Sequence, residues 1–325
     1  MHPALSVIFF TTLSGAGYGV LMWLGVLLAS EYVTGYRAEG NVPVFWAACL
    51  CAAAVLVTIG LLSSMLHLGK PARAWRSFSQ WRTSWLSREG VSALLTYLPV
   101  VALLAMIAMA VARPPLESPL RTPLLPASAA VLAICASATV FCTAMIYASL
   151  RTIPAWRHRL VVPTYLAFAL LSGGALLAAM SSVAGSGGSN ARAFAVMIAA
   201  SALLTALIKL AYWRAIDSQR LPVTRGDAVG MPGREISVFE RPHTEENYVT
   251  REMAFAVARK HARRLRAIAL VLFGVTPVLA AGAAARFTGA AGVAFTIAAL
   301  AVFAGAFIER WLFFAEARHV VTLYY

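Results

Sequence analysis

The sequence predicts an all-α integral membrane protein with eight transmembrane helices, which we expect to pack as two four-helix units. Three observations lead to this fold class: 60% of the 325 residues are hydrophobic, only 12% are charged, and long apolar segments recur along the whole chain. An ordinary soluble domain has about 25% charged residues. A bilayer core needs about 20 apolar residues per helix. The composition therefore excludes a water-soluble globular domain and indicates a single membrane domain over residues 1–325.

Eight segments have the length and apolar character of membrane spans. They are Ala4–Ser30, Pro43–Leu66, Gly90–Val111, Ala127–Leu150, Val161–Gly185, Ala193–Tyr212, Ala267–Ala285 and Ala290–Phe314. The first segment has no basic residues before it and no small-residue cleavage site after it, so we expect it to be retained.

Glycine and proline residues mark expected features within these spans. Gly15 and Gly19 lie one turn apart in the first segment, where two helix backbones can approach closely. Pro99 and Pro277 are expected to kink the third and seventh spans, because each removes a backbone donor. The sequence Leu-Ser-Gly occurs in both the first and the fifth spans, which favours two related four-helix units.

The formal net charge of +14 follows the predicted topology. Twenty-one lysines and arginines fall on the side of the membrane that holds both termini, and five fall on the other side. Basic residues collect on the cytoplasmic side of membrane proteins. We therefore predict a multi-pass protein of the bacterial inner membrane with both termini in the cytoplasm.

Cysteine and histidine residues do not form a metal-binding pattern. The four cysteines, Cys49, Cys51, Cys135 and Cys142, lie in apolar segments without CxxC spacing, so they are expected to be packing residues. Bis-histidine haem needs histidines inside helices. All six histidines fall in loops, tails or helix ends, which predicts neither haem nor an iron–sulfur cluster in this chain.

Ionisable residues are scarce within the apolar segments. Lys209, Glu309 and Arg310 are the nearest cases, and we expect their side chains to reach toward a helix end. Transporters place such groups near the middle of the membrane. A secondary transporter is therefore a weaker alternative, and the chemistry of the chain is expected at a membrane interface without proton pumping through the bundle.

The loop of residues 67–89 carries the densest set of polar and aromatic side chains, between the second and third spans. A quinone site needs an apolar slot, a hydrogen-bond donor and a group that exchanges protons. His67 can donate and exchange protons near neutral pH. Glu89 is a second candidate, and Trp75, Phe78, Trp81 and Trp85 could wall the ring pocket. The alternative is that these are ordinary interfacial anchors, because tryptophan and arginine collect at membrane surfaces.

This loop and its flanks contain Ser64-Met-Leu-His-Leu-Gly69, followed by Pro71, Arg73 and Leu86-Ser-Arg-Glu89. This motif resembles the membrane anchors of dimethyl sulfoxide reductase, the DmsC family, which is related to NrfD-type anchors. This resemblance implies a subunit that exchanges electrons between menaquinone or ubiquinone and a four-cluster iron–sulfur subunit, which in turn serves a molybdopterin catalytic subunit. It implies quinone binding by His67 with Glu89 as acidic partner, and places Ser64, Gly69, Arg73 and Trp75 in the same motif. The chain departs from the pattern at Trp75, at Gly90 and in a longer later loop.

That longer loop, residues 214–266, ends in a basic helix from about Met253 to Arg266. It could lie on anionic lipid or form a docking surface for a soluble partner. The segment Phe239–Tyr248 is similar to anchors of the sulfite-oxidising relatives of this family. The resemblance thus favours sulfite oxidation coupled to quinone reduction, with a quinol-oxidising sulfoxide reductase anchor as the alternative. A purely mechanical anchor without a redox role also stays open.

Overall fold

The computed structural model describes residues 4–34, 42–66, 68–112, 119–184, 187–219, 221, 223–237, 239–240 and 257–323. Within these ranges the regular secondary structure is entirely helical, and eight helices are long and apolar enough to cross a membrane. The predicted fold class is confirmed.

The first six spans are each one continuous helix: α1 (Leu5–Thr34), α2 (Val42–Met65), α3 (Trp85–Ala112), α4 (Leu124–Ala148), α5 (Val161–Val183) and α6 (Gly187–Ser218). The seventh is built from α9 (Val257–Leu270), a π-helical turn η4 (Val271–Val275) and α10 (Thr276–Arg286), and the eighth is α11 (Ala291–Ala315). The connections contain the 3₁₀ helices η1 (Pro71–Gln80), η3 (Pro119–Arg121), η5 (Thr288–Ala290) and η6 (Val320–Leu323), and the short α7 (Arg225–Ala228).

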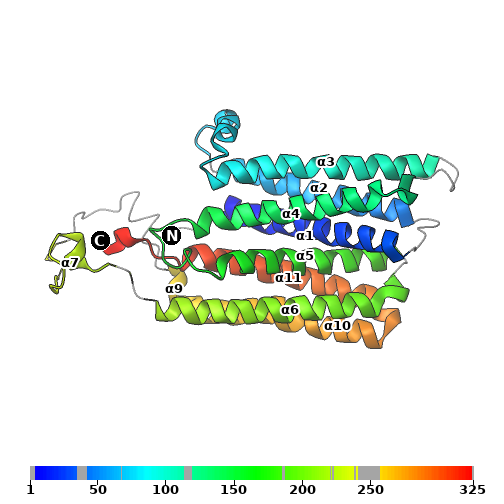
Figure 1. Ribbon diagram of the computed structural model, residues 1–325. Coiled ribbons are helices and arrows are strands. Elements are labelled where there is room, and N and C mark those ends of the chain that lie inside the picture. Colours follow the sequence, from blue (N-terminus) through cyan, green and yellow to red (C-terminus); the bar gives the residue numbers. More distant parts are fainter. Residues whose placement is uncertain are drawn as a thin grey trace.

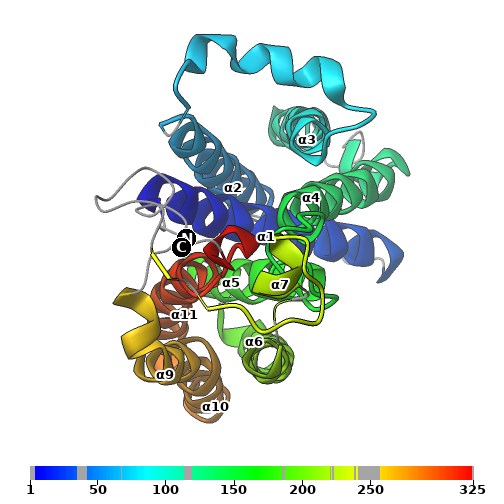
Figure 2. The same ribbon diagram turned by 90° about the vertical axis from the view of Figure 1, so that its left-hand side faces the viewer.

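The spans form one bundle around α1, which contacts α2, α4, α5 and α11 (Figures 1 and 2). Helices α1 to α4 pack among themselves, and α5, α6, α10 and α11 form a second group beside them. The beginning of α1, the end of α11, η1 and α7 lie at the same end of the bundle (Figure 1). We call this the basic end, because the chain segments predicted to hold most of the lysines and arginines begin or end here.

Glycines allow α1 and α5 to touch through their backbones. A Cβ atom added to Gly19 would lie 1.8 Å from the carbonyl oxygen of Ala169, and one added to Gly173 would lie 2.1 Å from the carbonyl carbon of Gly19. Close contact through small residues is the usual way for membrane helices to associate. The expected close packing at Gly19 is thus present, whereas a Cβ atom on Gly15 would meet nothing within 4 Å.

The irregularity of the seventh span lies just before Pro277. Proline cannot donate a backbone hydrogen bond, and a π-helical turn is one way for a helix to absorb this loss. Gly305 of α11 packs against Phe273 of the π-helical turn, with room for no side chain on the glycine.

We predict that Gly19→Ala destabilises the protein, because its methyl group collides with backbone atoms of α5 that cannot rotate away. Overpacking of this kind costs about 1–3 kcal/mol or more. Thermal denaturation of the detergent-solubilised protein measures the loss. Gly15→Ala is the matched control, one turn away on the same helix, and should unfold like the wild type. Equal stability of the two variants would contradict the backbone contact.

Candidate functional site

Glu89 lies inside the helix bundle and not in the preceding loop. Helix α3 begins at Trp85, earlier than the predicted start at Gly90, so Glu89 sits in its second turn. Its side chain is 5% exposed, and the hydroxyl of Thr143 on α4 donates a hydrogen bond to its carboxyl group. The early start of α3 therefore turns the carboxyl group toward α4.

The first turns of α3 also hold the end of the preceding loop. Arg88 lies over the ring of Trp85, with its guanidinium carbon 4.2 Å from the ring centroid, and donates to the carbonyl oxygens of Trp81 and Arg82. Ser87 donates to the carbonyl oxygen of Ser77. These contacts seat residues 77–82 against the first two turns of α3.

The helix η1 stands at the edge of the bundle with none of its residues buried (Figure 2). Trp75 is 67% exposed, and Phe78 and Trp81 are also exposed. The ring of Phe78 faces Gly90, where an added Cβ atom would lie 2.8 Å from it. A band of exposed aromatic side chains thus lies beside the end of α3 that buries Glu89.

The other predicted site residues do not converge on Glu89. Ser64 donates to Leu61 of its own helix, Gly69 has open space around it, and Arg73 is exposed. His67 lies outside the described residues. Among the described side chains, Glu89 is joined to Thr143 and to none of the predicted partners.

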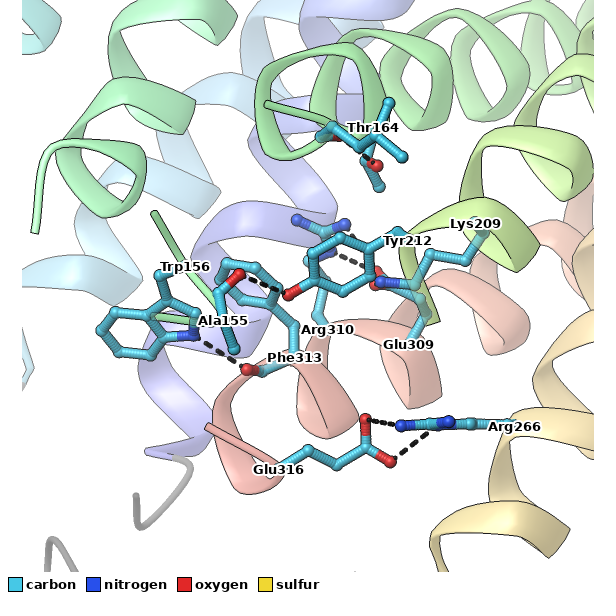
Figure 3. Close-up of polar contacts among 11 residues, drawn as sticks. Ala155, Trp156, Thr164, Lys209, Tyr212, Arg266, Glu309, Arg310, Phe313 and Glu316 are labelled. Carbon is cyan, nitrogen blue, oxygen red and sulfur yellow. Dashed lines mark hydrogen bonds and ion pairs between the residues drawn. The ribbon is translucent and has the colours of Figure 1, made fainter. Parts of the chain in front are cut away.

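Three charged side chains meet inside the bundle near its basic end. Lys209 of α6 and Arg310 of α11 both form ion pairs with Glu309, the latter with 2.6 Å between Arg310 Nε and Glu309 Oε2 (Figure 3). The side chains of Lys209, Arg310 and Glu309 are 1%, 3% and 0% exposed, respectively. The expectation that these residues reach toward a helix end is wrong, because the ion pairs hold them among α5, α6 and α11.

Aromatic rings surround these charges. The ammonium group of Lys209 lies 4.1 Å from the ring centroid of Tyr212, and the guanidinium carbon of Arg310 lies 4.0 Å from that of Tyr165. Tyr212 in turn donates to the carbonyl oxygen of Ala155 in the connection between α4 and α5, at 3.0 Å (Figure 3). Cations over aromatic faces gain electrostatic stabilisation in a dry setting.

A second ionic group closes the basic end between α6, α9 and α11. Arg266 donates to both carboxyl oxygens of Glu316 and to both of Asp217. Burial raises the pKa of Glu316, although Arg266 opposes this shift. The basic helix predicted to end near Arg266 is present from Val257 onward, and this group attaches it to the rest of the bundle.

Sequence reasoning missed the buried charges although their signal was visible. Glu309 and Arg310 are adjacent charges in an apolar segment, and Lys209 is a lone cation in another. Each lies within about three turns of a helix end, and the sequence alone could not distinguish pairing across helices from extension toward water.

The opposite end of the bundle holds an apolar groove of about 1710 Å³. It is lined by α1, α2, α5 and α6 and includes Trp23, Phe45, Trp46 and Phe194, with Arg192 at one edge. Such a surface accepts lipid tails or an apolar ring, but it lies away from Glu89. The described residues contain no group of three or more histidine, cysteine, aspartate or glutamate side chains that could hold a metal ion.

Comparison with known proteins agrees with this architecture. Residues 1–315 match the family model described as DMSO reductase anchor subunit (DmsC). The chain belongs to the DmsC family. It is 36% identical to a sulfite dehydrogenase subunit of Allochromatium vinosum, over 100% of this chain and 99% of that protein. As a DmsC-family chain with eight helices able to span a membrane, it is a multi-pass, anchor-type membrane protein.

We predict that Glu309→Ala destabilises this DmsC-family protein, because it leaves Lys209 and Arg310 buried without a counter-charge. Removing one partner of a buried ion pair costs roughly 3–5 kcal/mol. The apparent melting temperature and the yield of the purified protein report the loss. Glu235→Gln, which changes an exposed carboxylate, is the control and should leave both unchanged. A Glu309→Ala protein as stable as this control would show that the ion pairs contribute nothing.

Proposed function

We propose that this chain is the membrane anchor and quinone-reactive subunit of a molybdopterin oxidoreductase complex. It holds an iron–sulfur subunit and a molybdopterin catalytic subunit at the membrane and exchanges electrons with menaquinone or ubiquinone. The sequence identity to a sulfite dehydrogenase subunit favours sulfite oxidation coupled to quinone reduction as the reaction of the complex.

The observation that carries the proposal is the buried carboxyl group of Glu89 beside a band of exposed aromatic rings. A quinone ring needs an apolar slot at the depth of the lipid, and its reduction needs a group that delivers protons there. Glu89 is buried with Thr143 as partner, and the aromatic side chains of η1 stand next to the same helix end. The nearness of the buried carboxyl group to the exposed aromatic rings supports a quinone site at this helix end.

The residues proposed for the quinone site have separate roles in the reaction. Quinone takes up two electrons and two protons to become quinol. The iron–sulfur subunit supplies the two electrons. His67 hydrogen-bonds to one quinone oxygen and delivers one proton to it, and Glu89 delivers the second proton to the other oxygen. Trp75 and Phe78 flank the quinone ring. Ser64, Gly69 and Arg73 form the edge of the site, where Arg73 supplies a positive charge.

The basic end is the proposed docking face for the partner subunits, and it faces the cytoplasm. Its many lysines and arginines follow the rule for cytoplasmic loops. Helices α7 and α9 lie at this end, and the ionic group around Arg266 joins α9 to α6 and α11 (Figure 1). Anionic lipid is a second partner for the same basic residues.

The test compares two activities of the intact complex in membrane vesicles. With sulfite as donor, His67→Ala and Glu89→Gln should each lower the rate of quinone reduction at least about 100-fold, the usual size of acid–base contributions. The rate with a soluble dye as acceptor should stay unchanged, because the catalytic subunit is untouched. His158→Ala, at the same end of the bundle but between α4 and α5, is the control.

Three results would contradict the proposal. Quinone reduction at wild-type rates in both variants would remove the assigned site and leave a mechanical anchor. Absence of sulfite-to-quinone activity in the wild-type complex, with quinol-driven sulfoxide reduction instead, would favour the other enzyme class of the family. A chain that purifies without iron-containing partners would favour a transporter.

A further inference from the structure

A small cavity lined by both polar and apolar side chains lies inside the bundle between α1, α4, α5 and α11. Its volume is about 30 Å³, and all of its lining residues except Gly15 are buried. A single water molecule needs about 10–15 Å³ by this kind of measure, so the cavity has room for about two. The open space around Gly15 is part of this cavity.

Several polar atoms that line the cavity are buried without a hydrogen-bond partner among the described residues. They are the hydroxyl groups of Thr12, Tyr18 and Tyr165 and the Nη1 atom of Arg310. Arg310 lies near the Tyr165 hydroxyl and Thr139 near the Tyr18 hydroxyl, but neither contact has the geometry of a hydrogen bond. By contrast, Thr11 and Ser14 satisfy their hydroxyl groups on carbonyl oxygens of α1. Buried polar groups without a protein partner are typically satisfied by internal water, which makes two to four hydrogen bonds.

The cavity connects the proposed site to the buried charges. Thr143 lines it and donates to Glu89, and its oxygen can still accept a hydrogen bond from water. Arg310 lines the other side and is held there by Glu309, which also pairs with Lys209. The titratable or charged groups that line the cavity are therefore Tyr18, Tyr165 and Arg310. Glu89 lies behind Thr143, and Glu309 and Lys209 lie behind Arg310.

The two ends of the cavity differ in their access to water. Thr11 is six residues from the start of α1, a distance on the order of 10 Å along the helix from the basic end. Toward the other end, Tyr18 is followed at once by Gly19, where the backbones of α1 and α5 touch. The cavity is thus nearer the basic end, and the backbone contact of α1 with α5 lies on its other side.

From this geometry we infer that the cavity holds water and is the path by which Glu89 exchanges protons with the basic side of the membrane. The inference rests on the proposed function of Glu89. When Glu89 gives its proton to the reduced quinone, its carboxylate accepts the hydroxyl proton of Thr143. Thr143 takes a proton from a cavity water molecule in the same step, and that water molecule is reprotonated from bulk water at the basic end. One proton passes for each quinone reduced, and none crosses the membrane. Arg310 holds a fixed positive charge at the cavity wall and does not give up a proton.

The test removes two of the three unpaired hydroxyl groups with little change in volume, in the double variant Thr12→Val and Tyr165→Phe. In the intact complex, sulfite-to-quinone turnover should fall at least tenfold, with a larger solvent deuterium isotope effect and an unchanged KM for quinone. Sulfite-to-dye turnover should stay at the wild-type rate. Thr205→Val is the matched control, since this threonine is equally buried but bonds to Ser201 of its own helix.

Unchanged quinone turnover and an unchanged isotope effect in the double variant would overturn the proton path. Loss of both quinone and dye turnover would show that the two side chains have a structural role, and would also overturn the proton path. A wild-type complex without sulfite-to-quinone turnover would instead refute the proposed function.

X-ray hydroxyl-radical labelling of the wild-type complex tests for the cavity water directly, independently of any variant. Tyr18 and Tyr165 should be labelled several-fold faster than Tyr212, which is also buried but bonded to Ala155; equal or slower labelling would overturn the inference.

Discussion

The hydrocarbon of a bilayer offers no partner to a polar group, and this constraint decides where the charges of the bundle lie. Glu309 forms ion pairs with two cations from different helices, and all three side chains are almost completely buried. Their mutual attraction is strong only because the surroundings are dry, and for the same reason none of the three can stand alone. The contacts of α6 and α11 at the basic end are organised around this pairing.

The same constraint gives Glu89 its character. A carboxyl group buried one turn inside α3 needs a donor, and Thr143 on α4 provides it. Because α3 begins at Trp85, the group points into the bundle while the aromatic side chains of η1 stay outside. The carboxyl group and the aromatic band are thus neighbours on different sides of one helix end. A proton donor that must serve a lipid-soluble ring from within the protein fits this position.

Much of the fold could be predicted from the sequence, because membrane spans are specified by length and composition alone. The eight spans, the close contact at Gly19 and the basic helix after residue 256 were all visible in the residue pattern. The sequence predicts the start of α3 five residues late, because residues 85–89 have the composition of a polar membrane interface. This error put Glu89 in a loop. The pairing of Lys209 with Glu309 was also invisible, because it joins helices that are 100 residues apart in the chain, and single-sequence patterns do not report such contacts. The internal cavity depends on helix packing in the same way.

The central claim is that quinone binds where Glu89 enters the bundle, and photolabelling of the intact complex tests it most directly. A light-activated quinone analogue, displaced by excess natural quinone, should attach to residues 63–89 or to the part of α4 around Thr143, as read by mass spectrometry of the peptides. Competitive labelling confined to the apolar groove at the opposite end, on α2 and α6, would contradict the account.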